Sequence, residues 1–295
     1  MTDAIIDSQS ARRPGRAPSV GAMYGASRWW VLAAISIGLI LFLAPFVLAF
    51  TNAIRTPADY GTHGPLAFPR SFDLSALKAF WNNVDFTTKL INSTIISAAT
   101  AVIAVLLSLL NAYAIGIGRI KGSRVMLILL LIGIMIPQES LVYPIYYLSK
   151  AVGIFDTIWS VVIVFSVLQC AFGTYLLSSV MTAFPREIIE AAELDGATPW
   201  MILWTIIVPV LSPTLAVLAT FFFIWTWNEF LLPLVLLVSN SNQTVAVSMG
   251  VLNGQYVQTP TTTAAAALLG IAPTLLFFLI FQRTLTRGIV VGAVK

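Results

Sequence analysis

The sequence predicts an all-α membrane protein with six transmembrane helices. Of its 295 residues, 58% are hydrophobic and 9% are charged, and the mean hydropathy is +0.91. A water-soluble core cannot hold so much apolar surface. The apolar residues also occur in separate runs of about 20, the length of helix that crosses a hydrocarbon core of roughly 30 Å. Composition and run length together place the chain in a bilayer.

The apolar runs give the spans in order along the chain. Residues 102–107 and 127–132 are apolar on every side, which favours helices over the alternating pattern of barrel strands. Pro137 and Pro144 predict a kinked or broken helix in the third run. The fifth run has a hydrophobic extension to residue 238. The expected spans are residues 29–50, 90–117, 125–148, 158–181, 203–227 and 264–281.

The positions of Lys and Arg indicate that both termini are cytoplasmic. Basic residues precede the first span, fill the short loop after the second and follow the sixth, and such residues tend to remain on the cytoplasmic side. The uncharged loop 239–263 suits the opposite side. We therefore expect a multi-pass protein of the cytoplasmic (inner) membrane. Its parts would be a flexible basic tail (1–28), a transmembrane domain (29–282) and a cytoplasmic C-terminal tail (283–295).

The residue types for catalysis or metal binding are lacking. His63 and Cys170 are the single histidine and cysteine, so neither a zinc cluster nor a convincing Ser-His-Asp arrangement can be assembled. The sequence also lacks a Gly-x-x-x-x-Gly-Lys-Ser/Thr phosphate loop. We expect no catalytic residue, no metal site and no cofactor in this chain, and no nucleic-acid partner. ATP and Mg²⁺ would have to be bound by separate ATPase subunits.

An acidic helix is predicted in the loop of residues 184–203, between the fourth and fifth spans. Pro185 suits its first turn, where the missing backbone donor is not needed. Glu187 and Glu190 complement the positive end of the helix dipole. The predicted helix would lie across the cytoplasmic face of the membrane.

A sharp corner is predicted after this helix. Asp195 and Gly196 can supply the left-handed turn that ends it. Thr198 then suits the N-cap of a new helix, with Pro199 at the first helical position. The new helix would lead directly into the fifth span.

Two interpretations of the acidic helix are open. It could rest at the lipid headgroups, but it lacks the basic face typical of such anchors. Alternatively it docks onto a cytoplasmic partner, with Glu190 and Glu193 facing basic groups and with Ala191 and Ala192 permitting close contact. The docking interpretation fits these residues better.

The residues of this corner also resemble a known signature. Glu190-Ala191-Ala192, Gly196 and then Pro209 resemble the EAA motif of permease subunits in binding-protein-dependent ABC importers. From the first span onward the chain is similar to the shorter permease of the maltose-type carbohydrate branch. Supporting matches are Asp195-Gly196-Ala197, Trp227-Asn228-Glu229-Phe230 and the closing residues 287–295.

This resemblance implies an ABC type I importer permease fold and several partners. They are a second permease subunit, two ABC ATPase subunits that bind ATP and Mg²⁺, an extracytoplasmic solute-binding protein and a sugar substrate, all in or at the lipid bilayer. The implied ATPase-coupling residues are Glu190, Ala191, Ala192, Glu193, Asp195, Gly196 and Pro209. The implied contacts of the C-terminal tail with the ATPase pair are Arg287, Gly292 and Lys295.

Polar residues near helix breaks are candidates for the translocation pathway, because ionisable groups in a bilayer usually face a cavity or a partner. A structural hydrogen bond to a neighbouring helix is an equal alternative for Gln138 and Glu139. The candidate pathway residues are Gln138, Glu139, Tyr143, Asn228 and Glu229. Further side chains suited to stacking with or hydrogen-bonding to a sugar are Tyr146, Tyr147, Trp159 and Gln169.

The loop before the sixth span offers a second group of amides and hydroxyls. By the resemblance, it occupies the position that probes the solute-binding protein; a purely connecting loop is an equal alternative. Its candidate residues are Asn253, Gln255, Tyr256 and Gln258.

The expected function is therefore that of a permease subunit that moves a carbohydrate, such as a di- or oligosaccharide. A non-sugar solute such as glycerol phosphate is an alternative cargo. A stand-alone secondary transporter or channel is an alternative function, although six spans are few for one and no internal repeat is evident.

Overall fold

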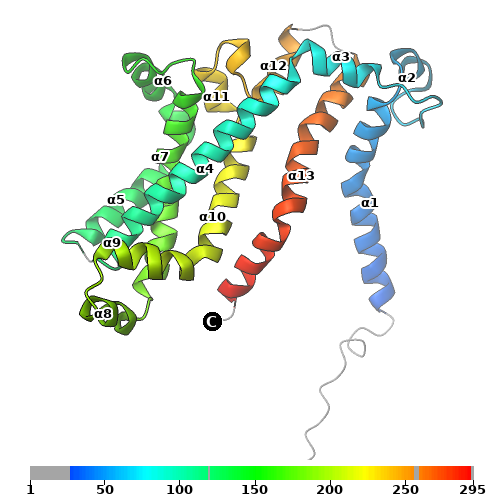
Figure 1. The fold of residues 1–295 in the computed structure, drawn as a ribbon. Coiled ribbons are helices and arrows are strands. Elements are labelled where there is room, and N and C mark those ends of the chain that lie inside the picture. Colours follow the sequence, from blue (N-terminus) through cyan, green and yellow to red (C-terminus); the bar gives the residue numbers. More distant parts are fainter. Residues whose placement is uncertain (1–26, 119, 256–258, 294–295) are drawn as a thin grey trace, which may run out of the picture. The chain divides into compact units, whose positions relative to one another are not determined.

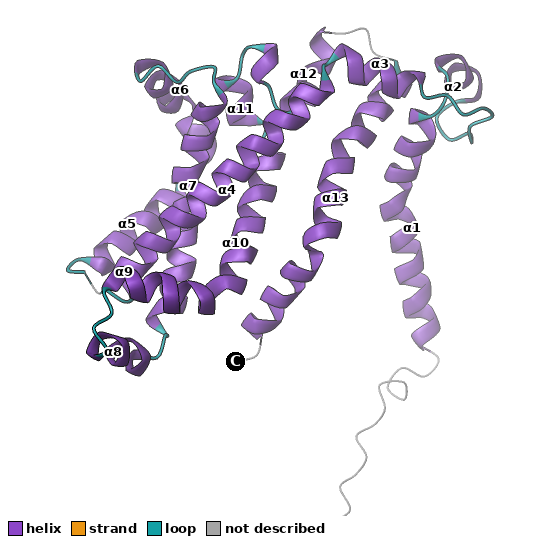
Figure 2. Cartoon of the chain, in the orientation of Figure 1, coloured by secondary structure: helices purple, strands orange, loops and turns teal. Residues whose placement is uncertain are grey.

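The computed structural model describes residues 27–118, 120–255 and 259–293, and within these ranges every regular element is a helix (Figures 1 and 2). The chain divides into two units, residues 1–48 and 49–295. The first unit contains most of α1 (Ser27–Ala53). Apolar side chains are exposed on every face of this helix, as the run 39–43 shows.

The prediction of an all-α membrane protein is confirmed. Among the described residues, five helical stretches are long and apolar enough to cross a membrane, and a bent pair of helices makes up to six. The five are Trp29–Ala53, Phe86–Gly116, Ile158–Thr182, Pro199–Asn228 and Pro260–Gln282, and the bent pair is Ser123–Met135 with Gln138–Ala151. The corresponding elements of the second unit are α4 (Phe86–Gly116), α5 (Ser123–Met135), α6 (Val142–Ala151), α7 (Ile158–Thr182), α9 (Pro199–Ile202), α10 (Val208–Asn228) and α13 (Pro260–Ala293).

The third run is broken, as Pro137 predicted, and its two halves form a bent pair that counts as a sixth candidate span when taken together. α5 ends at Met135, a 3-10 turn covers Gln138–Leu141, and the helix that follows is bent by 93°. Ile136, the residue before Pro137, has the extended backbone that a following proline favours, and α5 ends there. The bend directs the second half of the apolar run away from the axis of α5.

Short helices gather at the end of the second unit opposite to α8 (Arg186–Leu194) (Figure 1). The sequence had predicted loops for most of this region. The short helix α2 begins at a local capping residue: Thr56 is its N-cap, and the Thr56 hydroxyl accepts a hydrogen bond from Asp59 N. These elements are α2 (Pro57–His63), α3 (Ser75–Asn83), α11 (Leu231–Leu236) and α12 (Val245–Gln255).

The main core lies where α4, α7 and α10 pack together. Gly173 of α7 makes this close approach possible. A Cβ on Gly173 would lie 2.8 Å from Ser108 Cβ on α4 and 3.0 Å from Phe222 Cζ on α10. Small residues at such crossings let membrane helices approach closely. α5 packs on the outside of α7, and α13 packs against α10 and α3.

Buried polar contacts fix the end of the second unit that carries α11 and α12. Lys89, whose side chain is buried, donates to the Asn240 carbonyl. Asn92 Nδ2 donates to the Gln243 carbonyl at 3.1 Å. Asp156 accepts from the Asn242 amide through its backbone carbonyl at 2.6 Å. The segment after α11 is thereby tied to α4 and to the turn before α7.

Candidate functional site

The corner after α8 has the predicted geometry. Gly196 has φ 82°, in the left-handed region that favours glycine. Its N–H donates to the Glu193 carbonyl at 3.0 Å, and Ala197 N donates to the Ala192 carbonyl at 2.9 Å. These hydrogen bonds satisfy carbonyls at the end of α8, as in a Schellman-type cap.

The helix that follows begins as predicted. Thr198 is its N-cap, and the Thr198 hydroxyl accepts from Met201 N at 3.3 Å. Pro199 occupies the first turn. The Tyr113 hydroxyl, from α4, donates to the Pro199 carbonyl at 2.8 Å. The corner is therefore attached to the core helix α4 as well as to its own span.

A π-helical turn, Leu203–Ile207, connects the corner to α10. Val208 N donates to the Leu203 carbonyl, five residues back. Pro209 lies in the first turn of α10 and has no N–H to donate. Leu203 and Ile207 are buried in the core cluster between α4 and α7. Pro209, one of the residues predicted to couple to an ATPase, thus lies two residues after a widened turn, a feature that often occurs at functional sites.

The two faces of α8 differ in environment. Ile189 and Ala192 are partly buried and pack against the core cluster. Glu190, Ala191 and Glu193 are exposed. Ala192 lies on the inner face because it follows Ile189 by one turn, whereas the predicted contact of the two alanines with a partner stays a prediction. Glu190, Ala191 and Glu193 remain available for an external contact.

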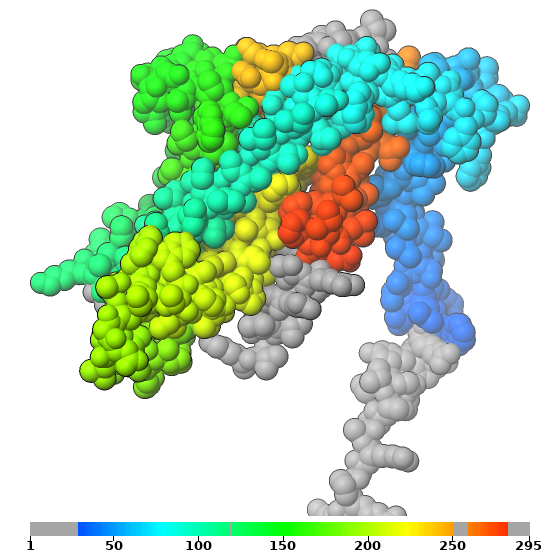
Figure 3. Space-filling view, in the orientation of Figure 1, coloured from blue at the N-terminus to red at the C-terminus, as the bar shows by residue number. Residues whose placement is uncertain are grey.

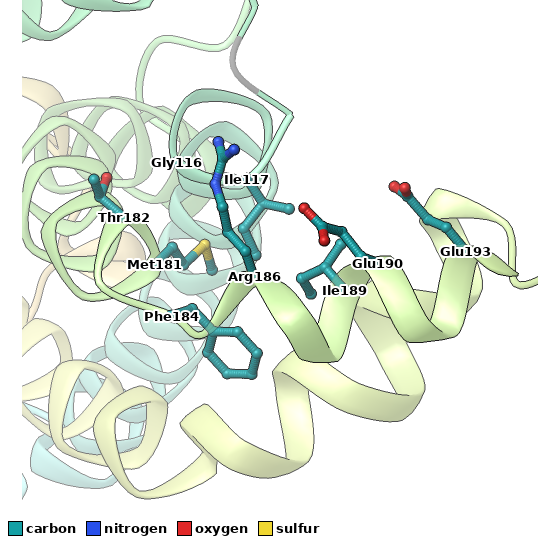
Figure 4. Close-up of a pocket in the computed structure, with 9 residues that line it drawn as sticks. All are labelled: Gly116, Ile117, Met181, Thr182, Phe184, Arg186, Ile189, Glu190 and Glu193. Carbon is teal, nitrogen blue, oxygen red and sulfur yellow. The ribbon is translucent and has the colours of Figure 1, made fainter.

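A groove of about 190 Å³ lies beside the acidic side chains (Figure 4). Arg186 lines it together with Glu190 and Glu193, and the ends of α4 and α7 form the opposite wall. Arg186 is not among the residues predicted for this site. The other lining residues are Gly116, Ile117, Met181, Thr182, Phe184 and Ile189.

Within the described part of the chain, neither Glu190 nor Glu193 forms a salt bridge. The two salt bridges found there join Asp59 to Arg55 and to His63. Leu194, at the end of α8, is 90% exposed. In the space-filling view, α8 and α9 (yellow-green) lie at the surface (Figure 3). The site is thus a hydrogen-bonded corner that presents an apolar side chain and two carboxylates with no salt-bridge partner among the described residues.

A second pocket, of about 430 Å³, lies at the break between α5 and α6. It brings together two predicted pathway residues, Gln138 and Glu229. Gln138 follows the end of α5, and Glu229 has extended backbone between α10 and α11. Interrupted helices of this kind line substrate sites in many transporters. The other lining residues are Gly133, Ile134, Met135, Ile136, Pro137, Leu141, Phe165, Leu168, Gln169, Phe172 and Trp225.

The other predicted pathway residues are not in the lining of this pocket. Glu139 is exposed in the 3-10 turn, and Tyr143 is exposed on α6. Asn228 Nδ2 donates to the Ile224 carbonyl of its own helix at 2.8 Å. Gln138, Glu139 and Tyr143 all follow the bend, and of these three only Gln138 lines the pocket.

Gln169, predicted as a side chain suited to a sugar but not named among the candidate pathway residues, also lines this pocket. Its amide nitrogen donates to Thr226 Oγ1 at 2.8 Å, and its oxygen has no hydrogen-bond partner among the described residues. The side chain is 7% exposed and lines the pocket. The signal in the sequence is an amide inside an apolar run. The rings of Phe172 and Trp225, with centroids 5.3 Å apart, adjoin it in the lining.

Two groups of predicted residues lie wholly or partly outside the described residues. Tyr256, Gln258 and Lys295 are among the residues that the structure does not describe. Asn253 and Gln255 are described only as backbone of α12. The backbone positions of Arg287 and Gly292 belong to α13, which extends well beyond the expected end at residue 281.

The chain matches a family model over residues 104–291, more than half of its length. The description of that family is binding-protein-dependent transport system inner membrane component. The matched region includes the acidic corner and the pocket at the helix break.

Individual proteins give the same result. The chain is 31% identical to the trehalose transport system permease protein SugB of Mycobacterium tuberculosis, over 92% of this chain and 98% of that protein. It is 28% identical to AmyC of Thermoanaerobacterium thermosulfurigenes, a probable starch degradation products transport system permease protein, over 87% and 93%.

A solved structure supports the fold. A chain of a bacterial ABC transporter involved in the import of the acidic polysaccharide alginate aligns with a TM-score of 0.74 at 20% identity, over 92% of this chain and 99% of that chain. Its identity is low, so this likeness shows the fold alone. With the family match and the curated relatives, the chain belongs to the binding-protein-dependent transport system inner membrane component family, as a multi-pass membrane protein.

Proposed function

We propose that this chain is a permease subunit that carries a di- or oligosaccharide across the cytoplasmic membrane, driven by separate ATPase subunits. Its partners are a second permease, two ABC ATPase subunits that bind ATP and Mg²⁺, and an extracytoplasmic solute-binding protein. The observation that carries the proposal is the corner at Gly196, which presents Glu190 and Glu193 without a salt-bridge partner among the described residues. A stand-alone transporter or channel would leave this surface without a role.

In the proposed orientation, α8 faces the cytoplasm. Lys121 and Arg124 support it, because Lys121 lies in the short turn between α4 and α5 and Arg124 in the first turn of α5, at the same end of the second unit as α8 (Figure 1). An ATPase subunit with a basic cleft would contact Glu190, Ala191 and Glu193. Tyr113 and the buried residues after Thr198 would then transmit its movement to the spanning helices.

The pocket between α5, α7 and α10 supports a sugar as the cargo. Sugars are held by hydrogen bonds to amides and carboxylates and by contact with aromatic faces, and Gln138, Gln169, Glu229 and Trp225 supply these groups. The names of the two curated relatives also refer to sugars, trehalose and starch degradation products.

Charge reversal tests the coupling role. The double variant Glu190→Arg with Glu193→Arg is expected to lose both co-purification of the ATPase subunits and uptake, because the carboxylates would be replaced by charges that repel a basic cleft. Glu187→Arg is the matched control, since this residue is exposed on the same helix but outside the groove. Wild-type assembly and uptake by the double variant would refute the docking role.

The cargo is tested separately. After reconstitution with the partner subunits and the solute-binding protein, ATP hydrolysis is expected to rise on addition of a di- or oligosaccharide. A response to glycerol phosphate, an amino acid or an ion, without a response to any sugar, would refute the substrate class and leave the coupling role intact.

A further inference from the structure

The loop between α2 and α3 exposes large apolar side chains. Leu66 is 76% exposed, and Phe68 and Phe72 are each 80% exposed. All three lie within residues 66–72, in the segment that joins α2 to α3. Side chains of this kind, gathered on one short segment, mark a surface that contacts something apolar.

This loop is held in place from its inner side. The guanidinium of Arg55 is wholly buried, and Nη1 donates to the Gly64 carbonyl at 2.9 Å and to the Ala67 carbonyl at 3.0 Å. Asp59 accepts from Arg55 Nε at 2.6 Å and so pairs the buried charge. The backbone beside Leu66 is therefore fixed, although the Leu66 side chain points to the outside.

Further hydrogen bonds fix the depth of the loop relative to the membrane span. Asn52 Nδ2 donates to the Pro65 carbonyl at 3.1 Å, and Asp73 N donates to the Ile54 carbonyl at 3.0 Å. Asn52 and Ile54 flank Ala53, the last residue of the candidate span Trp29–Ala53. The loop thus lies where this span leaves the hydrocarbon, at the level of the lipid headgroups.

The charge of the segment suits a lipid surface. Residues 64–72 contain no acidic residue, and the single charged residue among them is Arg70, which is exposed between Phe68 and Phe72. Interfacial membrane anchors combine such apolar side chains with Lys or Arg at the headgroup level. Long basic side chains can keep their charge at the phosphates while their stems lie along apolar surface.

We propose that residues 64–72 form an interfacial anchor, in which Leu66, Phe68 and Phe72 insert into the lipid leaflet and Arg70 contacts a lipid phosphate. In the orientation proposed above, this is the outer leaflet. The anchor fixes the end of α1 and the start of α3 at a set depth. It does not depend on the identity of the cargo or on the docking of α8.

Spin labels at single cysteines test the anchor directly. The variants Leu66→Cys, Phe68→Cys and Phe72→Cys are made in the full chain, purified with its accompanying subunits and placed in vesicles of phosphatidylethanolamine and phosphatidylglycerol. Cys170 is buried, and labelling of the unsubstituted chain measures its background. The matched control is Ala58→Cys, on the exposed side of the neighbouring helix α2.

The accessibility of each label to oxygen and to a water-soluble nickel chelate gives the result. We expect labels at positions 66, 68 and 72 to collide more with oxygen than with nickel, and the label at 58 to show the reverse. High nickel accessibility at positions 66, 68 and 72 would overturn the proposal in favour of a loop in water. Low accessibility to both reagents would overturn it in favour of a protein partner.

Discussion

Gly196→Ala is expected to weaken the contact between the acidic corner and the ATPase subunit. Gly196 has φ 82°, and no atom lies within 4 Å of the position of an added Cβ. The cost is therefore conformational, about 1–2 kcal/mol for an L-residue in the left-handed region. A difference of that size lowers the ratio of the intact corner to other conformations by a factor of about 5–30. Because only the intact corner binds, the apparent affinity should fall by up to the same factor.

The assay is titration of the purified ATPase subunits onto the permease in detergent, with the dissociation constant as the readout. Gly196→Asn should lose less affinity, because asparagine tolerates the left-handed region. Gly122→Ala provides the same strain at another site, since Gly122 has φ 87° and equally open space. Wild-type affinity in Gly196→Ala, or an equal loss in Gly122→Ala, would refute the reasoning.

Three further predictions concern the core, the pathway and the Arg55 site. Gly173→Ala should lower the free energy of unfolding by about 1–3 kcal/mol in thermal or denaturant unfolding, because its Cβ would overlap Ser108; Gly133→Ala, with open space, should not. Gln169→Met should reduce sugar uptake while changing stability by less than about 1.5 kcal/mol, and unchanged uptake would remove Gln169 from the pathway. The hydrogen bond from Arg55 holds the pKa of Asp59 below its usual value, so its stabilisation should be present above about pH 4 and lost as the pH falls further. Thermal unfolding of Asp59→Asn should depend less on pH in that range, and an equal dependence would contradict this assignment.

The sequence predicted the features that depend on local chemistry. The apolar runs gave the spans because a bilayer demands about 20 apolar residues per crossing. The corner after α8 was predictable from Gly196, Thr198 and Pro199. Each of these residues has a local backbone preference that does not depend on tertiary contacts.

What the sequence could not give depends on contacts between distant residues. Pro137 predicts a break but not a bend of 93°, because the angle is set by packing against other helices. Gln169 and Thr226 are 57 residues apart, so their hydrogen bond has no local signal. The inner position of Ala192 likewise follows from where α8 lies on the core.

The π turn before α10 also sets the rotational phase of that helix. Trp225 and Glu229, one turn apart, line the pocket, whereas Phe222 and Thr226, on an adjacent face, are buried in the protein. Each residue advances an α-helix by about 100°, so the loss of one residue from Leu203–Ile207 would turn the distal part of α10 by that angle. An insertion or deletion of one residue at this turn would therefore change which side chains of α10 face the pocket, although the turn lies far from the pocket and no lining residue is substituted.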